Sequence, residues 1–133
     1  MILGCGLSNI GAKLYQEGYL YITNVDFSSV VIDYMRSSHQ IFEEMDCKCT
    51  TIILYEVFDI DAQMDITEPT EIVQESFLCI FDKGTLDCVV CYDDTQLQQK
   101  VEAMLDNIFR ILAPGGTYIC VSRGSPETRL IFL

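Results

Sequence analysis

The sequence predicts an α/β fold in which helices flank a parallel β-sheet. Segments rich in β-branched and aromatic residues alternate with segments whose apolar residues recur at helical spacing. A glycine turn, Gly4-Cys5-Gly6, directly follows the first strand-like residues. Strands that alternate with helices form βαβ units, whose right-handed crossovers place successive strands parallel. We therefore expect a doubly wound sheet of about five strands.

The first half of the chain contains two predicted helices between strands. The first helix spans residues 8–17, because Ser8 or Asn9 can cap its start and Gly18 suits its end. The second helix spans residues 28–36, after which residues 37–49 are polar and include the single histidine, His39. The strands predicted in this half are residues 1–3, 20–25 and 50–58.

The second half begins with an acidic connection over residues 59–74. Residues 76–82 form a short continuous apolar run, as expected of a central buried strand. A turn and a short apolar segment follow, and residues 93–113 form the longest predicted helix. Pro114-Gly115-Gly116 ends that helix, and residues 117–122 are the last predicted strand.

The length and the net charge of the chain restrict the kinds of protein and of binding partner that are compatible with the sequence. The 133 residues suggest a single domain, and an apolar content of 50% excludes a disordered chain. Twenty acidic residues against eight basic ones give a formal net charge of −12. Such a surface repels phosphate backbones, so we expect no nucleic-acid partner and a basic protein surface as the partner instead. The oligomeric state is left open.

The seven cysteines indicate a reducing compartment. Their number is odd and several lie in apolar runs, as Cys79 and Cys120 do, which is typical of reduced core thiols. We find no run long enough to span a membrane and no signal peptide before the glycine turn, and we expect a cytoplasmic protein. The pairs Cys47/Cys49 and Cys88/Cys91 permit a zinc site, but Cys88 is expected in the core, and no metal is assigned.

The glycine turn is the first candidate binding feature. Gly4 and Gly6 let the backbone turn tightly beside a ligand, and Asp26 follows twenty residues after Gly6, at the end of the next strand. An acid in that place accepts hydrogen bonds from ribose hydroxyls. A dinucleotide fingerprint needs a third glycine where Asn9 stands, so a ribose ligand without pyrophosphate, such as S-adenosylmethionine, fits better than NAD. An ordinary turn and a helix cap are the structural alternatives.

Two further sites follow the same logic at later strand ends. Asp59 and Ile60 end the third predicted strand, where a carboxylate can accept from an adenine amino group and an apolar neighbour can cover the ring. Asp82 and Lys83 end the fourth, at the mouth of the expected cleft. A solvated loop acid and a plain turn are the corresponding alternatives.

Four segments resemble class I S-adenosylmethionine-dependent methyltransferases, within the group of elongation factor 1-alpha lysine methyltransferases. They are Ile2-Leu3-Gly4-Cys5-Gly6, Asn24-Val25-Asp26-Phe27-Ser28-Ser29-Val30-Val31, Phe81-Asp82-Lys83-Gly84-Thr85-Leu86-Asp87 and Arg110-Ile111-Leu112-Ala113-Pro114-Gly115-Gly116. The ending Ser125-Pro126-Glu127-Thr128-Arg129 also fits that group. The similarity covers the whole chain, and Asp-Lys-Gly-Thr-Leu-Asp is its most specific part.

The resemblance implies a Rossmann-like domain over residues 1–133 that binds S-adenosylmethionine. It implies a sheet order of 3-2-1-4-5, without the two last strands and the N-terminal cover that family members carry, so the domain is expected to be a core shortened at both ends. Leu7 departs from the asparagine usual in the family. The implied cofactor-binding residues are Gly4, Cys5, Gly6, Asp26, Phe27, Asp59, Ile60, Asp82 and Lys83.

The implied activity is methyl transfer to a protein lysine. This reaction is an in-line displacement in which positioning of the amine supplies most of the catalysis, so no nucleophilic residue is required. Asp82 and Asp87 are candidates to attract the cationic side chain of the substrate, and no other catalytic residue is assigned. The alternatives are a non-catalytic module that binds cofactor or a partner, and an NAD-binding domain.

Overall fold

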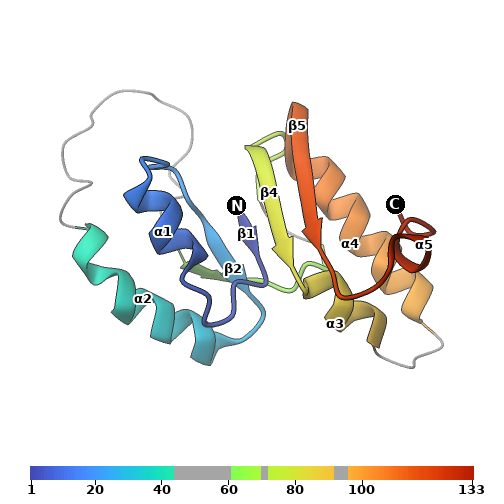
Figure 1. Cartoon of the computed structure of the whole chain (residues 1–133), viewed down its shortest axis with the longest axis horizontal. Helices are drawn as coiled ribbons and strands as arrows, with labels where there is room; N and C mark the ends of the chain where they lie inside the picture. The colour runs from blue at the N-terminus through green and yellow to red at the C-terminus, as the bar shows by residue number, and fades with distance from the viewer. Residues whose placement is uncertain (44–60, 70–71, 92–95) are drawn as a thin grey trace.

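The computed structural model describes residues 1–43, 61–69, 72–91 and 96–133 (Figure 1). Five strands form one sheet in the order β3-β2-β1-β4-β5, and every neighbouring pair is parallel. This confirms the predicted α/β fold and strand order. The elements are β1 (Ile2–Leu3), α1 (Ile10–Gln16), β2 (Asn24–Asp26), α2 (Ser29–Glu43), β3 (Asp61–Gln63), β4 (Phe77–Lys83), α3 (Thr85–Cys91), α4 (Leu97–Ile111), β5 (Leu112–Val121) and α5 (Pro126–Arg129).

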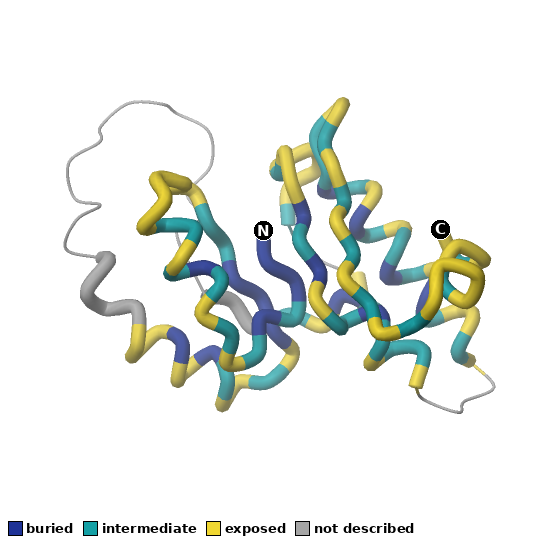
Figure 2. Tube along the Cα trace, in the orientation of Figure 1, coloured by how far each residue is buried: buried dark blue, intermediate teal, exposed yellow. Residues whose placement is uncertain are grey.

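Two core clusters lie on opposite faces of the sheet. Consecutive strand residues point to opposite faces, so Ile2 packs in one cluster and Leu3 in the other. The smaller cluster joins β1 to Ile32 and Met35 of α2. The larger cluster joins β1, β2 and β4 to α3 and α4, whose buried stripe includes Met104. Figure 1 shows α1 and α2 beside β2, and Figure 2 shows the buried residues concentrated in the central strands.

The bounds of three elements between residues 20 and 63 differ from those expected from the sequence. The strand β2 is shorter than residues 20–25, and the helix α2 continues past residue 36 to Glu43. The predicted strand over residues 50–58 lies outside the described residues, and the strand that pairs with β2 is instead Asp61–Gln63. The carboxyl end of the third strand therefore falls several residues later than expected.

The second half contains a helix where the sequence pattern predicts only a short apolar segment. This helix, α3, begins at Thr85 directly after the turn. The helix α4 ends at Ile111 rather than residue 113, and β5 starts at once. Pro114 explains the early end, since proline disfavours helical backbone at the residue before it. The pairing of β4 with β5 shifts register between Phe77 and Cys79, across the glycine pair.

The described cysteines are less buried than expected. Cys5 is buried, as predicted for a core thiol, but Cys79, Cys88 and Cys91 are exposed. The expectation for Cys88 was wrong, because the inward side of α3 is occupied by Leu86. Cys47 and Cys49 lie outside the described residues, and within the described ones no group of three metal-ligating side chains is found. None of the helices in this part of the chain is long and apolar enough for a membrane crossing.

Candidate functional site

The glycine turn has the tight backbone conformation that its sequence predicts. Gly4 and Gly6 have φ values of +57° and +52°, in the left-handed region that favours glycine. A Cβ on Gly4 would overlap the hydroxyl of Thr85, whose Oγ1 donates a 2.9 Å hydrogen bond to the carbonyl of Leu3. A Cβ on Gly6 would meet only open space. The first glycine is therefore needed for packing, and the second keeps space open beside the turn.

Asp26 connects the glycine turn to the start of α2. Its side chain is buried at the carboxyl end of β2, and its Oδ2 accepts a 2.9 Å hydrogen bond from the Gly6 amide. Its Oδ1 accepts a 3.0 Å hydrogen bond from the Ser28 amide. Each carboxylate oxygen has two lone pairs, so both keep capacity for a ligand hydroxyl. Phe27, the next residue, is 71% exposed.

The carboxyl end of β3 carries Asp65 and Ile66 in the position expected for Asp59 and Ile60. The Met64 amide donates to the carbonyl of Asp26 at 2.7 Å, which carries the strand pairing up to this point. The side chain of Ile66 is buried, and Asp65 is exposed.

Asp59 and Ile60 themselves lie outside the described residues. The dipeptide Asp-Ile occurs twice in this region, at 59–60 and at 65–66. The dipeptide that marks the expected adenine-binding position is therefore present in the sequence. Where β3 ends determines which of the two copies lies at the strand end.

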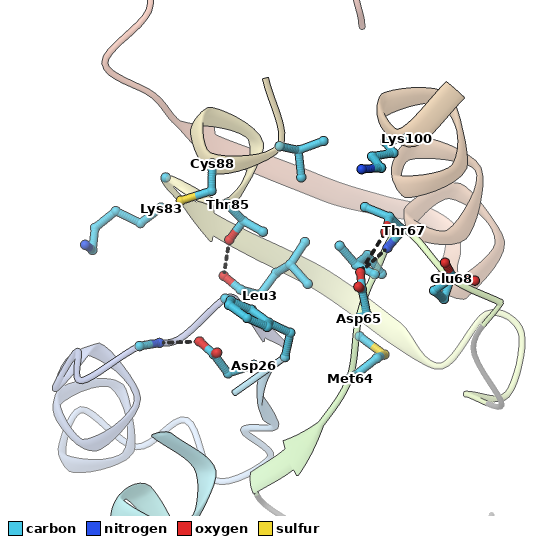
Figure 3. A pocket seen from close by; sticks show the side chains of 16 residues that line it. Leu3, Asp26, Met64, Asp65, Thr67, Glu68, Lys83, Thr85, Cys88 and Lys100 are labelled. Atoms are coloured by element: carbon cyan, nitrogen blue, oxygen red, sulfur yellow. Dashed lines mark hydrogen bonds between the residues drawn. The ribbon is translucent and has the colours of Figure 1, made fainter. Parts of the chain in front are cut away.

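These strand ends surround a cavity of about 560 Å³ (Figure 3). The cavity lies at the end of β1, which has β2 as its neighbour on one side and β4 on the other. The strand order reverses direction at this point, so it is the switch point of a doubly wound sheet. Figure 3 places Lys83 and Lys100 on opposite sides of it. The lining residues are Leu3, Gly4, Gly6, Asp26, Phe27, Met64, Asp65, Ile66, Thr67, Glu68, Lys83, Gly84, Thr85, Cys88, Val89 and Lys100.

The cavity brings together most of the predicted binding residues. Gly4, Gly6, Asp26, Phe27 and Lys83 all line it. Cys5 does not, because its side chain is buried in the smaller core cluster behind the turn. The residues that the loop after β3 and the helix α4 add to the cavity wall were not predicted from the sequence, since neither segment follows a recognisable motif.

Asp82 is a buried structural acid rather than a group at the cavity mouth. Its side chain is fully buried and caps α3, accepting from the amides of Thr85 at 2.7 Å and Leu86 at 3.1 Å. The Tyr118 hydroxyl donates to it at 2.8 Å from β5. Burial, reinforced by the Asp82 carboxylate, raises the pKa of Tyr118. Asp82 therefore does not line the cavity, whose mouth was its expected place.

Asp87 also does not line the cavity. Its carboxylate accepts hydrogen bonds from the Ser122 hydroxyl, from the Arg123 amide at 2.8 Å and from the Arg129 guanidinium at 2.9 Å. The Ser122 bond, followed by the Arg123 amide and by Arg129, lowers the pKa of Asp87 to about 2. These bonds connect α3 to the C-terminal segment, and Asp87, like Asp82, is not among the residues that line the cavity.

Comparison with solved structures shows a shared fold. A protein of Methanococcus maripaludis, provisionally named as an S-adenosyl-L-methionine-dependent methyltransferase, aligns with a TM-score of 0.63 at 17% identity, over 98% of this chain and 51% of that one. A protein of Pyrococcus horikoshii aligns with a TM-score of 0.60 at 17% identity, over 90% of this chain and 46% of that one. Both confirm the Rossmann-like architecture.

Sequence comparison shows the family. Human "eEF1A lysine and N-terminal methyltransferase" is 34% identical over 122 residues, which are 92% of this chain and 16% of that protein. Mouse "EEF1A lysine methyltransferase 4" is 26% identical over 138 residues, covering 98% of this chain and 48% of that protein. The chain thus spans less than half the length of these relatives. A family profile described as "Methyltransferase domain" matches residues 1–120. The resemblance inferred from the motifs is therefore confirmed, and the chain belongs to this methyltransferase domain family.

Proposed function

We propose that this domain binds S-adenosylmethionine and transfers its methyl group to a lysine side chain of a protein. The observation that carries the proposal is the cavity at the sheet switch point, where the glycine turn is hydrogen-bonded to Asp26. Family membership supports the reaction type, and the names of the relatives support a lysine of a translation factor as the kind of target.

The residues around the cavity suit a nucleoside that lacks a pyrophosphate. Asp26 offers acceptors for two ribose hydroxyls, and the exposed ring of Phe27 offers an apolar face beside them. Asp65 takes the adenine-binding role first expected of Asp59, with the apolar side chain of Ile66 next to it. The cavity volume lies in the range of small-molecule sites. The glycine turn would lie against the amino-acid end of the cofactor.

The bound cofactor would supply an electrophilic methyl group on a positively charged sulfur. The protein then has to hold a neutral amine in line with that methyl carbon, at about 3 Å, and exclude water. Desolvation of a substrate lysine favours its neutral form. The net charge of −12 would steer a basic protein toward the domain. We further propose a cytoplasmic location, in keeping with such a substrate.

A non-catalytic module that binds cofactor or a partner is the second candidate. The observation that favours it is the structural use of both candidate acids, because Asp82 caps α3 and Asp87 holds the C-terminal segment. Both carboxylates are bonded within the protein and neither lines the cavity. Cofactor binding without turnover is the outcome that this alternative predicts.

Calorimetry with S-adenosylhomocysteine and with NAD tests the cofactor assignment. We expect binding of the first and none of the second. The Phe27→Ala variant should weaken binding about tenfold, because it removes an apolar face without disturbing the core. Val30→Ala is the matched control, since Val30 is 75% exposed on α2 and does not line the cavity. Absence of S-adenosylhomocysteine binding by the unaltered chain would refute the proposal.

Methylation of purified eEF1A with labelled S-adenosylmethionine separates the two candidates. Label transfer to a lysine that, at limiting cofactor, is reduced in Phe27→Ala and unchanged in Val30→Ala supports the enzyme. Binding without any label transfer supports the non-catalytic module.

A further inference from the structure

The helix α4 holds the loop that forms one side of the cavity. The Nδ2 atom of Asn107 donates to two backbone carbonyls in that loop, at 2.8 Å to Ile66 and at 2.9 Å to Glu68. One turn later on the helix, Arg110 donates from Nη1 to the carbonyl of Ile72 at 2.8 Å. The loop is therefore attached to α4 through its backbone.

The segment held in this way is part of the cavity wall. Each residue from Met64 to Glu68 lines the cavity. Within the segment, Asp65 accepts from the amide and the hydroxyl of Thr67, at 2.9 Å and 2.8 Å, and both bonds end on Oδ1. No hydrogen bond among the described residues ends on its Oδ2. The position of that oxygen depends on where the loop backbone is held.

The chemistry of an asparagine side chain matches this task. A primary amide carries two N–H donors on one nitrogen, so it can satisfy two carbonyls at once, whereas aspartate offers none and serine one. The orientation of the amide follows from its contacts, because its oxygen would be repelled by both carbonyls.

We propose that Asn107 is a positioning residue that fixes the loop after β3 and thereby sets the preference of the cavity for an adenine base. This inference rests on the proposed function, since Asp65 acts on the base only if an adenosine ligand binds. Asn107 touches the loop backbone from α4 and does not line the cavity itself. It acts through Asp65, whose carboxylate accepts from an adenine amino group and repels the carbonyl of hypoxanthine.

The test compares S-adenosylhomocysteine with S-inosylhomocysteine by calorimetry in the intact chain. The unaltered protein should prefer the adenine compound by at least tenfold. Asn107→Asp keeps the shape of the side chain but removes both donors. We expect it to weaken binding of the adenine compound about tenfold and binding of the inosine compound much less, so that the preference collapses. Asn107→Leu removes the donors without adding charge and should reproduce the result.

A matched control separates loop positioning from charge and from stability. Gln98→Glu makes the same amide-to-acid change on the same helix, where the Gln98 amide bonds Glu102 at 3.0 Å on the exposed side. It should leave both affinities within twofold. Ile32→Val loosens the opposite core cluster, and it shows what general destabilisation does to the two affinities.

A double-mutant cycle tests whether Asn107 acts through Asp65. If it does, Asp65→Asn and Asn107→Asp each abolish the adenine preference and their combination loses little more than either alone. Full additivity would overturn the positioning role, as would an unchanged preference in both Asn107 variants. If the unaltered chain binds neither compound, the proposed function and this inference are both wrong. If it binds both compounds equally, only this inference is wrong.

Discussion

The two glycines of the turn should respond differently to the same substitution. Both have positive φ, but a Cβ on Gly4 would overlap Thr85, whereas a Cβ on Gly6 would enter open space at the cavity. Gly4→Ala should therefore unfold more easily, and Gly6→Ala should keep most of its stability but bind cofactor poorly.

The magnitudes follow from the geometry. Left-handed backbone costs an alanine about 1–2 kcal/mol in either position. Gly4→Ala also displaces the hydroxyl of Thr85 from the carbonyl of Leu3, which adds about 1 kcal/mol for the lost hydrogen bond. We expect a loss in unfolding free energy of about 2–3 kcal/mol for Gly4→Ala and about 1–2 kcal/mol for Gly6→Ala. Binding of S-adenosylhomocysteine should weaken more than tenfold in Gly6→Ala, because the added methyl occupies ligand space.

Urea unfolding and calorimetry measure the two effects separately. Thr85→Ser in the Gly4→Ala background is an informative partner, because it removes the Thr85 methyl but keeps the overlapping oxygen, and it should restore little stability. Equal destabilisation by the two glycine substitutions would refute the steric argument. Undiminished cofactor binding by Gly6→Ala would refute the placement of the cofactor against the turn.

Three further predictions concern the acids and the thiol near the cavity. Asp82→Asn should lower the unfolding free energy by about 2–3 kcal/mol in urea titrations, because an amide nitrogen cannot accept from the helix amides, while affinity for S-adenosylhomocysteine changes less than threefold in calorimetry. The pKa of Asp87 is lowered to about 2 in the folded chain and lies near 4 in the unfolded chain, so its contribution is fully present above pH 4 and is lost as the pH falls toward 2. The stability difference between the unaltered chain and Asp87→Asn, up to about 2 kcal/mol at pH 6, should stay nearly constant down to about pH 4 and then shrink in unfolding titrations from pH 4 to pH 2. A difference that stays constant down to pH 2 would contradict the cause given for the low pKa. Alkylation of Cys88, followed by peptide mass mapping, should slow when S-adenosylhomocysteine is bound, whereas the exposed Cys79 outside the cavity should react at an unchanged rate.

The strand order was predictable because the motifs carry both a residue pattern and a position in the sheet. Gly4 and Asp26 mark the ends of two neighbouring strands, and both line the cavity as expected. Element bounds were less predictable. The start of β5 at Leu112 depends on pairing with β4, which local propensity does not reveal.

The site residues were predictable where a glycine or the end of a strand determines their place. They were not predictable where contacts between distant parts of the chain determine it. The choice between Asp59 and Asp65 depends on the register of β3 against β2, which repeats of the same dipeptide cannot specify. Asp82 and Asp87 belong to the most recognisable motif, but Asp82 also accepts from Tyr118 of β5 and Asp87 from Arg129, both far along the chain. The local sequence pattern of an acid at a strand end is therefore the same whether its side chain faces a ligand or the protein interior.

The central place of β1 has a consequence for the folding kinetics of the chain. Its residue Ile2 pairs with Asn24 on one side and with Phe81 on the other. Closing the second pair requires a much longer loop, so we expect the β1–β2 pair to form early and the docking of β4 to limit the folding rate. The cavity is complete only after that last step. A ligand that binds there selects the fully docked chain and slows its unfolding, so cofactor supply would influence how long the domain survives in the cell.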